Sequence, residues 1–307
     1  MRHPLNYRTC PDRTAPTKRA LLLIGMNGSF GGLDAEEDMK IASFNINGVK
    51  ARGPALARWL DSAKPDLAVL QEIKSTDESF PRALIEDRGY NLETHGQKGF
   101  NGVAILSKLP LEDVIRGLPG DEDDLQARWI EASVSTSAGV LKVVGLYLPN
   151  GNPVETQQDG SPIPGGKYAY KCAWMARMEK RLRALLDLEI PLAVMGDYNI
   201  IPQAMDAARP DAWKDDALFR LQSRKAFRRM LNLGMTEAFR TRHPDPGHYT
   251  FWDYQAGAFE RNDGIRIDHI LLNAYAADLL QECQIDADTR AQEKPSDHVP
   301  IWAELAL

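Results

Sequence analysis

Short apolar runs recur along the chain from Lys40 onward, and they constrain the fold more than any other feature of the sequence. Each run has the length of a β-strand, and most are bounded by Gly, Pro, Asn, Asp or Ser. The runs are KIASFN, DLAVLQE, GVAILS, WIEASVST, LKVVGLYL, PLAVMGDYN, GIRIDHILL and VPIWAEL. Helical stretches lie between some of them, so the pattern predicts an α/β fold.

The helical stretches are residues 54–63, 167–188 and 224–233. The apolar residues of the second recur every three or four positions: Tyr170, Trp174, Met178, Leu182 and Leu185. Such a stripe predicts packing against a sheet. Residues 128–136 and 140–148 are joined by SAG, a hairpin-like link, so the sheets cannot be all parallel. About a dozen strands tend to divide into two sheets, so we expect two stacked sheets covered by helices.

The chain from 39 to 307 contains no repeat, low-complexity tract or linker, which predicts a single domain. Residues 1–38 differ, because their Pro, Gly, Thr and Arg residues follow no helical or strand period. Two interpretations stay open for this segment. It is a disordered extension, or it is a mis-called leader upstream of a true start at Met39.

Composition sets the broad class of protein. The hydrophobic fraction is 43% and the charged fraction 26%, as in ordinary soluble globular proteins. Three widely spaced cysteines form no disulfide framework, and the apolar run at 20–26 is too short to span a membrane. We therefore predict a cytoplasmic protein. The net charge of −6 gives no global basic field, although a bound metal ion could supply positive charge for a polyanion.

Several of the strand-like runs end in polar residues that a core would not accommodate. They are Asn45, Asn47, Glu72, Tyr147, Asn150, Asp197 and Asn199, followed later by Asp268 and by Asp297 and His298 in the SDH tripeptide. Taken singly, each is explained by a turn, a helix cap or a solvated strand end. Taken together they indicate a site. Asp197 and Asn199 share one face if their strand persists, and Asp268 interrupts an apolar run, where a carboxylate needs a partner such as His298.

Carboxylates from separate strands are a harder ligand set than zinc prefers, and they suit Mg²⁺ or Mn²⁺. The chemistry that such a set supports is attack of water on a phosphate ester. Competing motifs are missing from the sequence. It has no Gly-x-Ser-x-Gly elbow, so Ser296, Asp297 and His298 make a poor hydrolase triad, and it has no His-Glu-x-x-His and no phosphate-binding loop.

The motifs as a set resemble a known family. They are SFNINGVKAR, LAVLQEIK, GQKGFNGVAILSK, GLPGDEDDLQARWI, LYLPNG, VMGDYNI, FWDY, GIRIDHIL and KPSDHVPIW. In order and spacing they are similar to the exonuclease III family of apurinic/apyrimidinic endonucleases, from Met39 to the C-terminus. The resemblance implies a four-layered α/β sandwich, with two mixed sheets packed face to face and helices on both outer sides.

The resemblance also implies roles for the residues at the strand ends. Glu72 is the principal metal ligand with Asn45 beside it, and Asp297 completes or assists the metal site. Asp197 is the general base or water-orienting group, held by Asn199. His298 contacts the phosphate with its ring fixed by Asp268, and Tyr147 lies near the phosphate. The implied metal ligands are Asn45, Glu72, Asp197, Asn199, Asp297 and His298. The number of metal ions and the identity of the proton acceptor stay open.

On the substrate side, the aromatic residues Phe251 and Trp252 offer a wedge or a pocket wall, and Ile265 and Ile267 could line the same pocket. For one of the two aromatic residues a core position is the alternative, and Phe251 matches the family pocket better. The expected DNA contacts from loops are Lys50, Arg52 and Lys98, joined by Asn47, Asn150 and Lys171. The Pro- and Gly-rich stretch after LYLPNG is long for such a loop and could alter which DNA ends are accepted.

These observations predict a Mg²⁺-dependent DNA repair nuclease, with Mn²⁺ as a substitute metal. It would cleave duplex DNA 5′ to abasic sites and remove nucleotides or blocking groups from 3′ ends. We expect a monomer with no obligate protein partner and no membrane association. Two alternatives stay open: a phosphodiesterase of another branch of the superfamily, acting on RNA, lipid or inositol phosphates, and a catalytically inactive DNA-binding relative.

Overall fold

The computed structural model describes residues 38–307, and these residues form two six-stranded mixed β-sheets. The first sheet has the strand order β11-β12-β1-β2-β4-β3. Its strands are β1 (Asp38–Asn45), β2 (Leu67–Gln71), β3 (Asn91–His95), β4 (Val103–Ser107), β11 (Leu280–Ile285) and β12 (Ile301–Ala306). β1 runs parallel to β2 and antiparallel to β12. The interpretation of 1–38 as an extension or leader falls almost wholly outside the described residues.

The second sheet has the order β5-β6-β7-β8-β10-β9. Its strands are β5 (Glu112–Arg116), β6 (Trp129–Thr136), β7 (Gly139–Tyr147), β8 (Leu192–Asp197), β9 (Thr236–Glu237) and β10 (Asp268–Leu272). β6 and β7 form the expected antiparallel hairpin, β7 and β8 are parallel, and β10 is antiparallel to β8.

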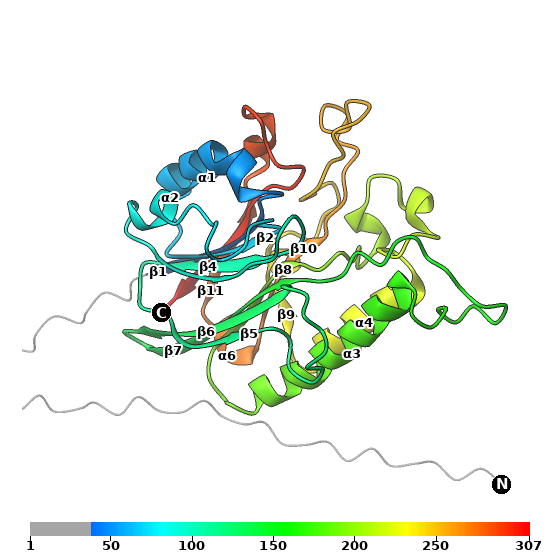
Figure 1. Cartoon of the computed structure of the whole chain (residues 1–307), viewed down its shortest axis with the longest axis horizontal. Coiled ribbons are helices and arrows are strands. Elements are labelled where there is room, and N and C mark those ends of the chain that lie inside the picture. Colours follow the sequence, from blue (N-terminus) through cyan, green and yellow to red (C-terminus); the bar gives the residue numbers. More distant parts are fainter. Residues whose placement is uncertain (1–37) are drawn as a thin grey trace, which may run out of the picture. The chain divides into compact units, whose positions relative to one another are not determined.

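The two sheets pack face to face, and helices cover their outer faces (Figure 1). The core between the sheets contains Ile41, Val69 and Ile105 from the first sheet and Val143 and Met195 from the second, all fully buried. Because successive side chains of a strand point to opposite faces, the alternate residues of the same strands face the helices. The predicted four-layered α/β sandwich is confirmed.

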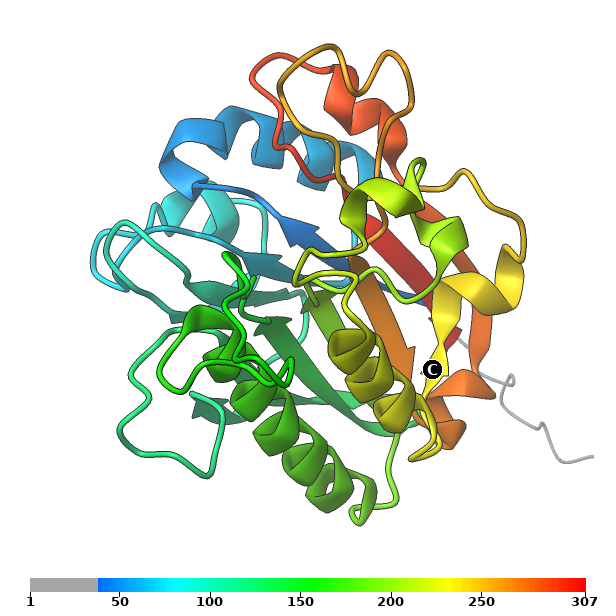
Figure 2. The same cartoon turned by 90° about the vertical axis from the view of Figure 1, so that its right-hand side faces the viewer.

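On the first sheet, α1 (Val49–Ala63) and α2 (Ala83–Glu86) pack through buried residues such as Leu56, Trp59 and Ile85. On the second sheet, α3 (Lys167–Leu186) and α4 (Leu221–Leu231) lie side by side (Figure 2). The remaining helices are short: α5 (Ala238–Arg242), α6 (Ala274–Ala277), η1 (Ala204–Asp206), η2 (Pro210–Trp213) and η3 (Ala287–Ala291). No helix among residues 38–307 is both long and apolar enough to cross a bilayer.

All eight predicted strands are present, and the apolar stripe of α3 packs as expected, with Trp174, Met178, Leu182 and Leu185 buried. The sequence did not reveal β3, β5, β9 and β11. All four are edge strands: β3, β5 and β11 carry polar or exposed residues, and β9 is only two residues long. Edge strands are solvated along much of their length, so they lack the apolar runs from which we inferred the other strands.

Two details of the strand ends differ from the sequence analysis. β8 ends at Asp197, and Asn199 has a φ of +47°, so Asp197 and Asn199 do not share one face through strand alternation. Asp268 is the first residue of β10 rather than a mid-strand interruption. The residues 265–267 before it belong to a loop, where the backbone of Ile265 pairs with Phe251 and Ala207.

Candidate active site

The polar residues at the strand ends meet because of the strand directions. β1 and β2 are parallel, as are β7 and β8, so their carboxyl ends lie at the same end of the sandwich. β10 and β12 run the opposite way and begin there, with Asp268 paired in register with Asp197. Between β7 and β8 the approach is close: a Cβ atom at Gly196 would lie 2.0 Å from the carbonyl oxygen of Leu146, so only glycine fits beside Asp197.

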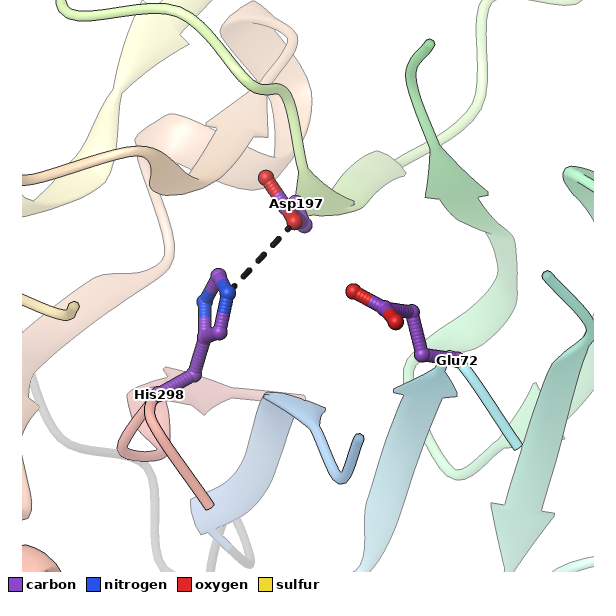
Figure 3. Close-up of side chains that lie close together, drawn as sticks. All are labelled: Glu72, Asp197 and His298. Atoms are coloured by element: carbon purple, nitrogen blue, oxygen red, sulfur yellow. Dashed lines mark ion pairs between the residues drawn. The ribbon is translucent and has the colours of Figure 1, made fainter. Parts of the chain in front are cut away.

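Three of these side chains, Glu72, Asp197 and His298, form a compact set that we call the acid–histidine group (Figure 3). One potential ligand atom from each lies within 4.8 Å of the others. Nε2 of His298 is 3.8 Å from Oδ2 of Asp197. Asp197 and His298 are buried, whereas the side chain of Glu72 is 18% exposed. The group is therefore accessible to solvent from the Glu72 side.

Asn45 connects two members of this group. Its Nδ2 donates to Oε1 of Glu72 at 2.9 Å and to Oδ2 of Asp197 at 3.0 Å, while its Oδ1 accepts from the backbone N–H of Asn47. In this arrangement the amide nitrogen, and not the oxygen, faces the carboxylates. Asn45 therefore fixes the spacing of Glu72 and Asp197. Its Oδ1 could bind a metal ion beside them only if the side-chain amide rotated.

His298 is fixed by a fully buried carboxylate. Its Nδ1 donates to Oδ2 of Asp268 at 2.8 Å, as the sequence led us to expect, which leaves Nε2 toward Asp197. Oδ1 of Asp268 has no hydrogen-bond partner among the described residues. Burial alone would lower the pKa of His298, but the charges of Asp268 and Asp197 outweigh it and raise that pKa. The imidazole is thus positively charged at neutral pH.

The two carboxylates of the acid–histidine group have opposite electrostatic environments. Burial raises the pKa of Asp197, and the nearby charges of Asp268 and Glu72 add to this against the opposing effect of His298. Burial also acts to raise the pKa of Glu72, but the hydrogen bond and charge of Lys74, 2.8 Å away, lower it overall. Glu72 is therefore the more persistent anion, and Asp197 is the carboxylate better able to take up a proton.

Tyr147 ends β7 beside this group. The guanidinium of Arg128 lies 4.8 Å from the centre of its ring. Burial and the carboxylates of Glu72 and Asp197 raise the pKa of Tyr147 well above its usual value. The hydroxyl is therefore protonated at neutral pH and serves as a donor, not as a phenolate.

The remaining predicted ligands lie around the acid–histidine group rather than in it. Oδ1 of Asp297 accepts from Nδ2 of Asn47 at 2.9 Å. Asn199 donates its backbone N–H to Oδ1 of Asp197 at 2.8 Å, and its own side chain is bonded to the carbonyl of Leu148 and to Asn150. In this conformation Asn199 holds Asp197 in place.

Lys171 requires a correction. We expected a DNA contact, but its side chain is fully buried, and Nζ donates to the carbonyl oxygens of Asn150 at 3.0 Å and Asn199 at 2.6 Å. Burial lowers its pKa to about 7. A lysine in this position ties together the loops after β7 and β8 and cannot reach a phosphate from solution.

The other expected DNA contacts lie in two loops and at the start of α1. Lys50, Lys98 and Asn150 are exposed, and Nδ2 of Asn150 donates to Oδ1 of Asn199 at 3.1 Å. Arg52 is half-buried, because it donates to the carbonyls of Asn47 and Pro295 and to the hydroxyl of Tyr254. Lys50 and Lys98 therefore present exposed positive charge to a polyanion, whereas Asn150 is already bonded to Asn199 and Arg52 holds the segment that carries Asp297 in place.

The two aromatic residues of FWDY have different surroundings. Phe251 is half-buried, and its ring packs edge-on against the ring of His298 with centroids 5.0 Å apart. Trp252 is only 3% exposed and donates Nε1–H to Asn262, so the expectation that it contacts DNA is corrected to a core position. Ile265 and Ile267 are each 2% exposed in one small apolar cluster with Phe251, so Phe251 presents the accessible surface.

The sequence analysis missed two kinds of residue. Lys74, two positions after Glu72 in the motif QEIK, was not recognised as its ion-pair partner. Arg266 and its carboxylate partners near Asp268 were also missed. A buried arginine in an apolar run such as GIRIDHILL was the available signal, because arginine is almost never fully buried unless it is paired.

The acid–histidine group fits a hard divalent cation by its donor chemistry. The carboxylates of Glu72 and Asp197 are oxygen ligands of the kind that Mg²⁺ and Mn²⁺ take, and no cysteine lies in the group. Burial, with the charges of Asp268 and Glu72, raises the pKa of Asp197, and a bound cation would offset the cost of keeping this carboxylate ionised.

Comparisons with known proteins agree with this geometry. Residues 42–298 match the sequence model of the Endonuclease/Exonuclease/phosphatase family. Exodeoxyribonuclease III of Haemophilus influenzae is 37% identical over 87% of this chain and all of its own length. DNA repair nuclease APEX1 of Danio rerio is 30% identical, with 88% of this chain and 83% of that protein covered.

Two solved structures share the fold. A 3′-5′ exonuclease from Neisseria meningitidis superposes with a TM-score of 0.80 at 36% identity, covering 87% of this chain and 99% of that one. An AP endonuclease from Archaeoglobus fulgidus superposes with a TM-score of 0.79 at 35% identity, covering 88% and 100%. The chain therefore belongs to the endonuclease/exonuclease/phosphatase family. Within that family it is a hydrolytic nuclease.

Proposed function

We propose that this chain is a Mg²⁺-dependent DNA repair nuclease that hydrolyses phosphodiesters 5′ to abasic sites and removes nucleotides or blocking groups from 3′ ends of duplex DNA. The observation that carries the proposal is the acid–histidine group, placed at one end of the sandwich with Asp268 behind the imidazole. The relatives named as exodeoxyribonuclease III, AP endonuclease and DNA repair nuclease support the choice of substrate.

Each residue of the site has a task in the proposed reaction. Glu72 and Asp197 would hold the metal ion, with Asn45 setting their spacing, and Asp297 would support the site through Asn47. A bound Mg²⁺, or Mn²⁺ in its place, supplies positive charge that offsets the negative charge developing on the phosphate.

Asp197 orients the attacking water and accepts its proton. Asn199 fixes that carboxylate through its backbone N–H. The charged Nε2–H of His298 and the hydroxyl of Tyr147 donate to non-bridging phosphate oxygens, and Asp268 keeps the imidazole charged and in one tautomer.

Duplex DNA is bound by the exposed Lys50 and Lys98, with Asn47, Arg52 and Asn150 nearby. Phe251 and the residues behind it, Ile265 and Ile267, form the apolar wall beside the scissile bond. We further propose that residues 39–307 are one catalytic domain, that the protein acts as a cytoplasmic monomer, and that it needs no protein partner.

The test uses three labelled duplexes: one with a single abasic analogue, one intact, and one with a 3′-phosphate end. Each is incubated with the protein in Mg²⁺ and in a chelator, and the products are separated on a denaturing gel. We expect Mg²⁺-dependent incision 5′ to the abasic analogue and release of nucleotides or phosphate from 3′ ends. Asp197→Asn protein, purified in the same way, controls for contaminating nuclease. No metal-dependent cleavage of any duplex would overturn the proposal.

A further inference from the structure

A basic surface lies on the outer side of the second sheet, where α3 and α4 run side by side (Figure 2). It consists of Lys180 and Arg183 of α3 and Lys225, Arg228 and Arg229 of α4, all exposed, and we call it the basic face. The chain as a whole has a net charge of −6, so positive charge is concentrated here against the average of the molecule. No member of the basic face belongs to the acid–histidine group or to the DNA contacts expected from the sequence.

Helix periodicity directs these side chains toward solvent. Lys225, Arg228 and Arg229 lie within about 100° of one another around the axis of α4, because successive residues of a helix are about 100° apart. Phe227 and the other apolar residues of α4 point the opposite way and are buried in the core shared with α3 and the second sheet. α4 contains no acidic residue, and α3 contains one, Glu179. The fold therefore presents the positive charges of both helices on one outer surface.

Only part of this positive charge is paired. Oε1 of Glu179 accepts from Nη2 of Arg183 at 2.9 Å, and its Oε2 accepts from Nε of Arg229 at 2.8 Å, so one carboxylate joins the two helices. Lys180, Lys225 and Arg228 are exposed, and among residues 38–307 none of them has an ion-pair partner. A cluster of cations with a single carboxylate attracts a polyanion.

The basic face extends away from the end of the sandwich that carries the candidate active site. On the first turns of α3, Nζ of Lys171 donates to the carbonyl oxygens of Asn150 and Asn199, which belong to the loops of that site. Lys180 and Arg183 follow on the same helix, about 14 and 18 Å farther along its axis at 1.5 Å per residue. Phosphates of one DNA strand are about 3.4 Å apart along the duplex axis, so this distance corresponds to about four to five base pairs.

We propose that the basic face binds the sugar–phosphate backbone of duplex DNA on one flank of the site, about four or more base pairs from the scissile phosphate. The proposal rests on the proposed nuclease function, which makes duplex DNA the polyanion in question. Contacts from lysine and arginine to phosphates position a protein on the duplex without reading its sequence. The basic face therefore raises the affinity for any duplex that is long enough, abasic or intact, and takes no part in the chemistry.

The surface fits DNA better than it fits a membrane. A helix that lies in a bilayer needs an exposed apolar face to insert beside its cations. The apolar face of α4 is buried in the core instead, and Leu221 is the only large apolar side chain that is exposed on the two helices as the structure describes them. One such residue leaves the basic face with charge but without the apolar surface for membrane insertion.

The test uses two triple variants of the full chain. The first replaces the members of the basic face that have no carboxylate partner, by Lys180→Gln, Lys225→Gln and Arg228→Gln, and leaves both pairs of Glu179 intact. The control removes the same charge where β2 and β3 begin and β4 ends, at the opposite end of the sandwich from the active site, by Lys64→Gln, Arg88→Gln and Lys108→Gln.

Binding is measured in EDTA by fluorescence anisotropy on three duplexes that carry an abasic analogue. One has about 15 base pairs on each side of the analogue, and the other two keep only about three base pairs on one side or on the other, closed by a hairpin loop. Affinity is measured over a series of salt concentrations. Single-turnover incision of the same duplexes is then followed in Mg²⁺ at saturating protein.

On the symmetrical duplex, the basic-face variant should bind at least about fivefold more weakly than wild type, and the slope of log K against log salt should fall in magnitude by about 1–3. The control variant should bind within about twofold of wild type. On one of the two truncated duplexes the difference between wild type and the basic-face variant should disappear, because the flank that reaches the basic face is missing. The incision rate at saturation should stay within about twofold of wild type, since no reacting group is changed.

Equal affinity of wild type and the basic-face variant for the symmetrical duplex would overturn the proposal. So would an equal loss in the control variant, or a loss that persists on both truncated duplexes. Unchanged binding to every duplex together with lost binding to phosphatidylglycerol vesicles would assign the surface to a membrane instead. If wild type cleaves no duplex but the flank-dependent loss is present, the nuclease proposal fails and the basic-face proposal stands. If wild type cleaves and the loss is missing, the reverse holds.

Discussion

Two buried sets of charged side chains lie at neighbouring positions of this fold, and they differ in how their charge is balanced. In the acid–histidine group and its neighbour Asp268, carboxylates surround the imidazole of His298. In the second set, which we call the arginine–carboxylate cluster, Asp206 and Glu237 are matched by Arg240 and Arg266. Only Ile267 separates Arg266 of one set from Asp268 of the other in the sequence.

The difference has consequences for the pKa values. In the arginine–carboxylate cluster, burial acts to raise the pKa of Glu237, but Arg266 and His269 lower it to about 2. In the acid–histidine group, the pKa of Asp197 is raised instead. Removal of one partner from a balanced set destabilises the fold, because it leaves an unpaired buried charge, whereas an unbalanced set is a candidate site for a cation.

The balanced cluster also supports the unbalanced one. Nη1 of Arg266 lies 3.0 Å from Nδ1 of His269, and Nε2 of His269 lies 3.1 Å from the carbonyl oxygen of Ile200. Ile200 follows Asn199 directly. The start of β10, which carries Asp268, is thereby joined to the loop that holds Asp197.

The largest effect should come from breaking the balanced cluster. Arg266→Met removes the positive charge that pairs with both Asp206 and Glu237, so buried negative charge is left without a partner. We expect the unfolding free energy to fall by about 3–5 kcal/mol. Urea denaturation measures this. Arg209→Met, which breaks the exposed pair with Asp263, is the control and should cost no more than about 1 kcal/mol. A loss for Arg266→Met as small as that of the control would contradict the balanced-cluster interpretation.

Variants of the acid–histidine group should lose activity rather than stability. Asp197→Asn and His298→Asn should each lower turnover on the abasic duplex at least about a hundredfold, because each removes a contact made in the transition state. Asp197→Asn should not lower the unfolding free energy, since the variant removes one of several crowded negative charges. Asp187→Asn, an exposed carboxylate after α3, should keep full activity. Near-normal turnover in either active-site variant would refute the assignment.

The third effect is stabilisation by metal. If Glu72 and Asp197 bind Mg²⁺, a concentration of 100 times Kd should raise the unfolding free energy by about 2.7 kcal/mol. Thermal unfolding with increasing Mg²⁺, at constant ionic strength, measures the shift. Glu72→Gln should lose most of it, and Glu86→Gln, an exposed glutamate of α2, should keep it. An equal shift in both variants would place the metal elsewhere.

The smallest effect concerns acid. The pKa of Glu237 is lower in the folded state than its ordinary value of 4.5, so its contribution to stability is complete above about pH 4.5 and is lost as the pH falls toward 2. Glu237→Gln should therefore show a shallower fall of unfolding free energy in this window. The difference in slope should reach up to about 1.4 kcal/mol per pH unit. Parallel curves for the two proteins would mean that Glu237 is not held ionised by Arg266.

Much of the fold could be predicted because apolar runs with polar ends define strands whose ends must meet. The pairing of Asp268 with His298 followed from the same logic, since a carboxylate in an apolar run needs a partner. The depth of a side chain is harder to predict. Lys171 lies on the first turns of α3 like a solvated lysine, and only the packing of the loops after β7 and β8 over it shows that it is buried.

The arginine–carboxylate cluster could not be predicted from the sequence for a related reason. Its members come from η1, β9, α5 and the loop before β10, and no local spacing brings them together. The stop of β8 at Asp197 also depends on tertiary structure, because Asn199 adopts a positive φ to return its amide toward Leu148 and Asn150.

The position of β12 has a consequence for biosynthesis. β12 lies between β11 and β1, and its register pairs Lys40 with Glu304 and Ser43 with Ile301. Of the described strands, β1 is synthesised first and β12 last. β1 therefore cannot pair with β12 until translation of the described residues is almost complete. His298 arrives with that last strand. A nascent chain therefore carries Glu72 and Asp197 long before it can cut DNA, and the order of synthesis itself delays nuclease activity until the sheet closes.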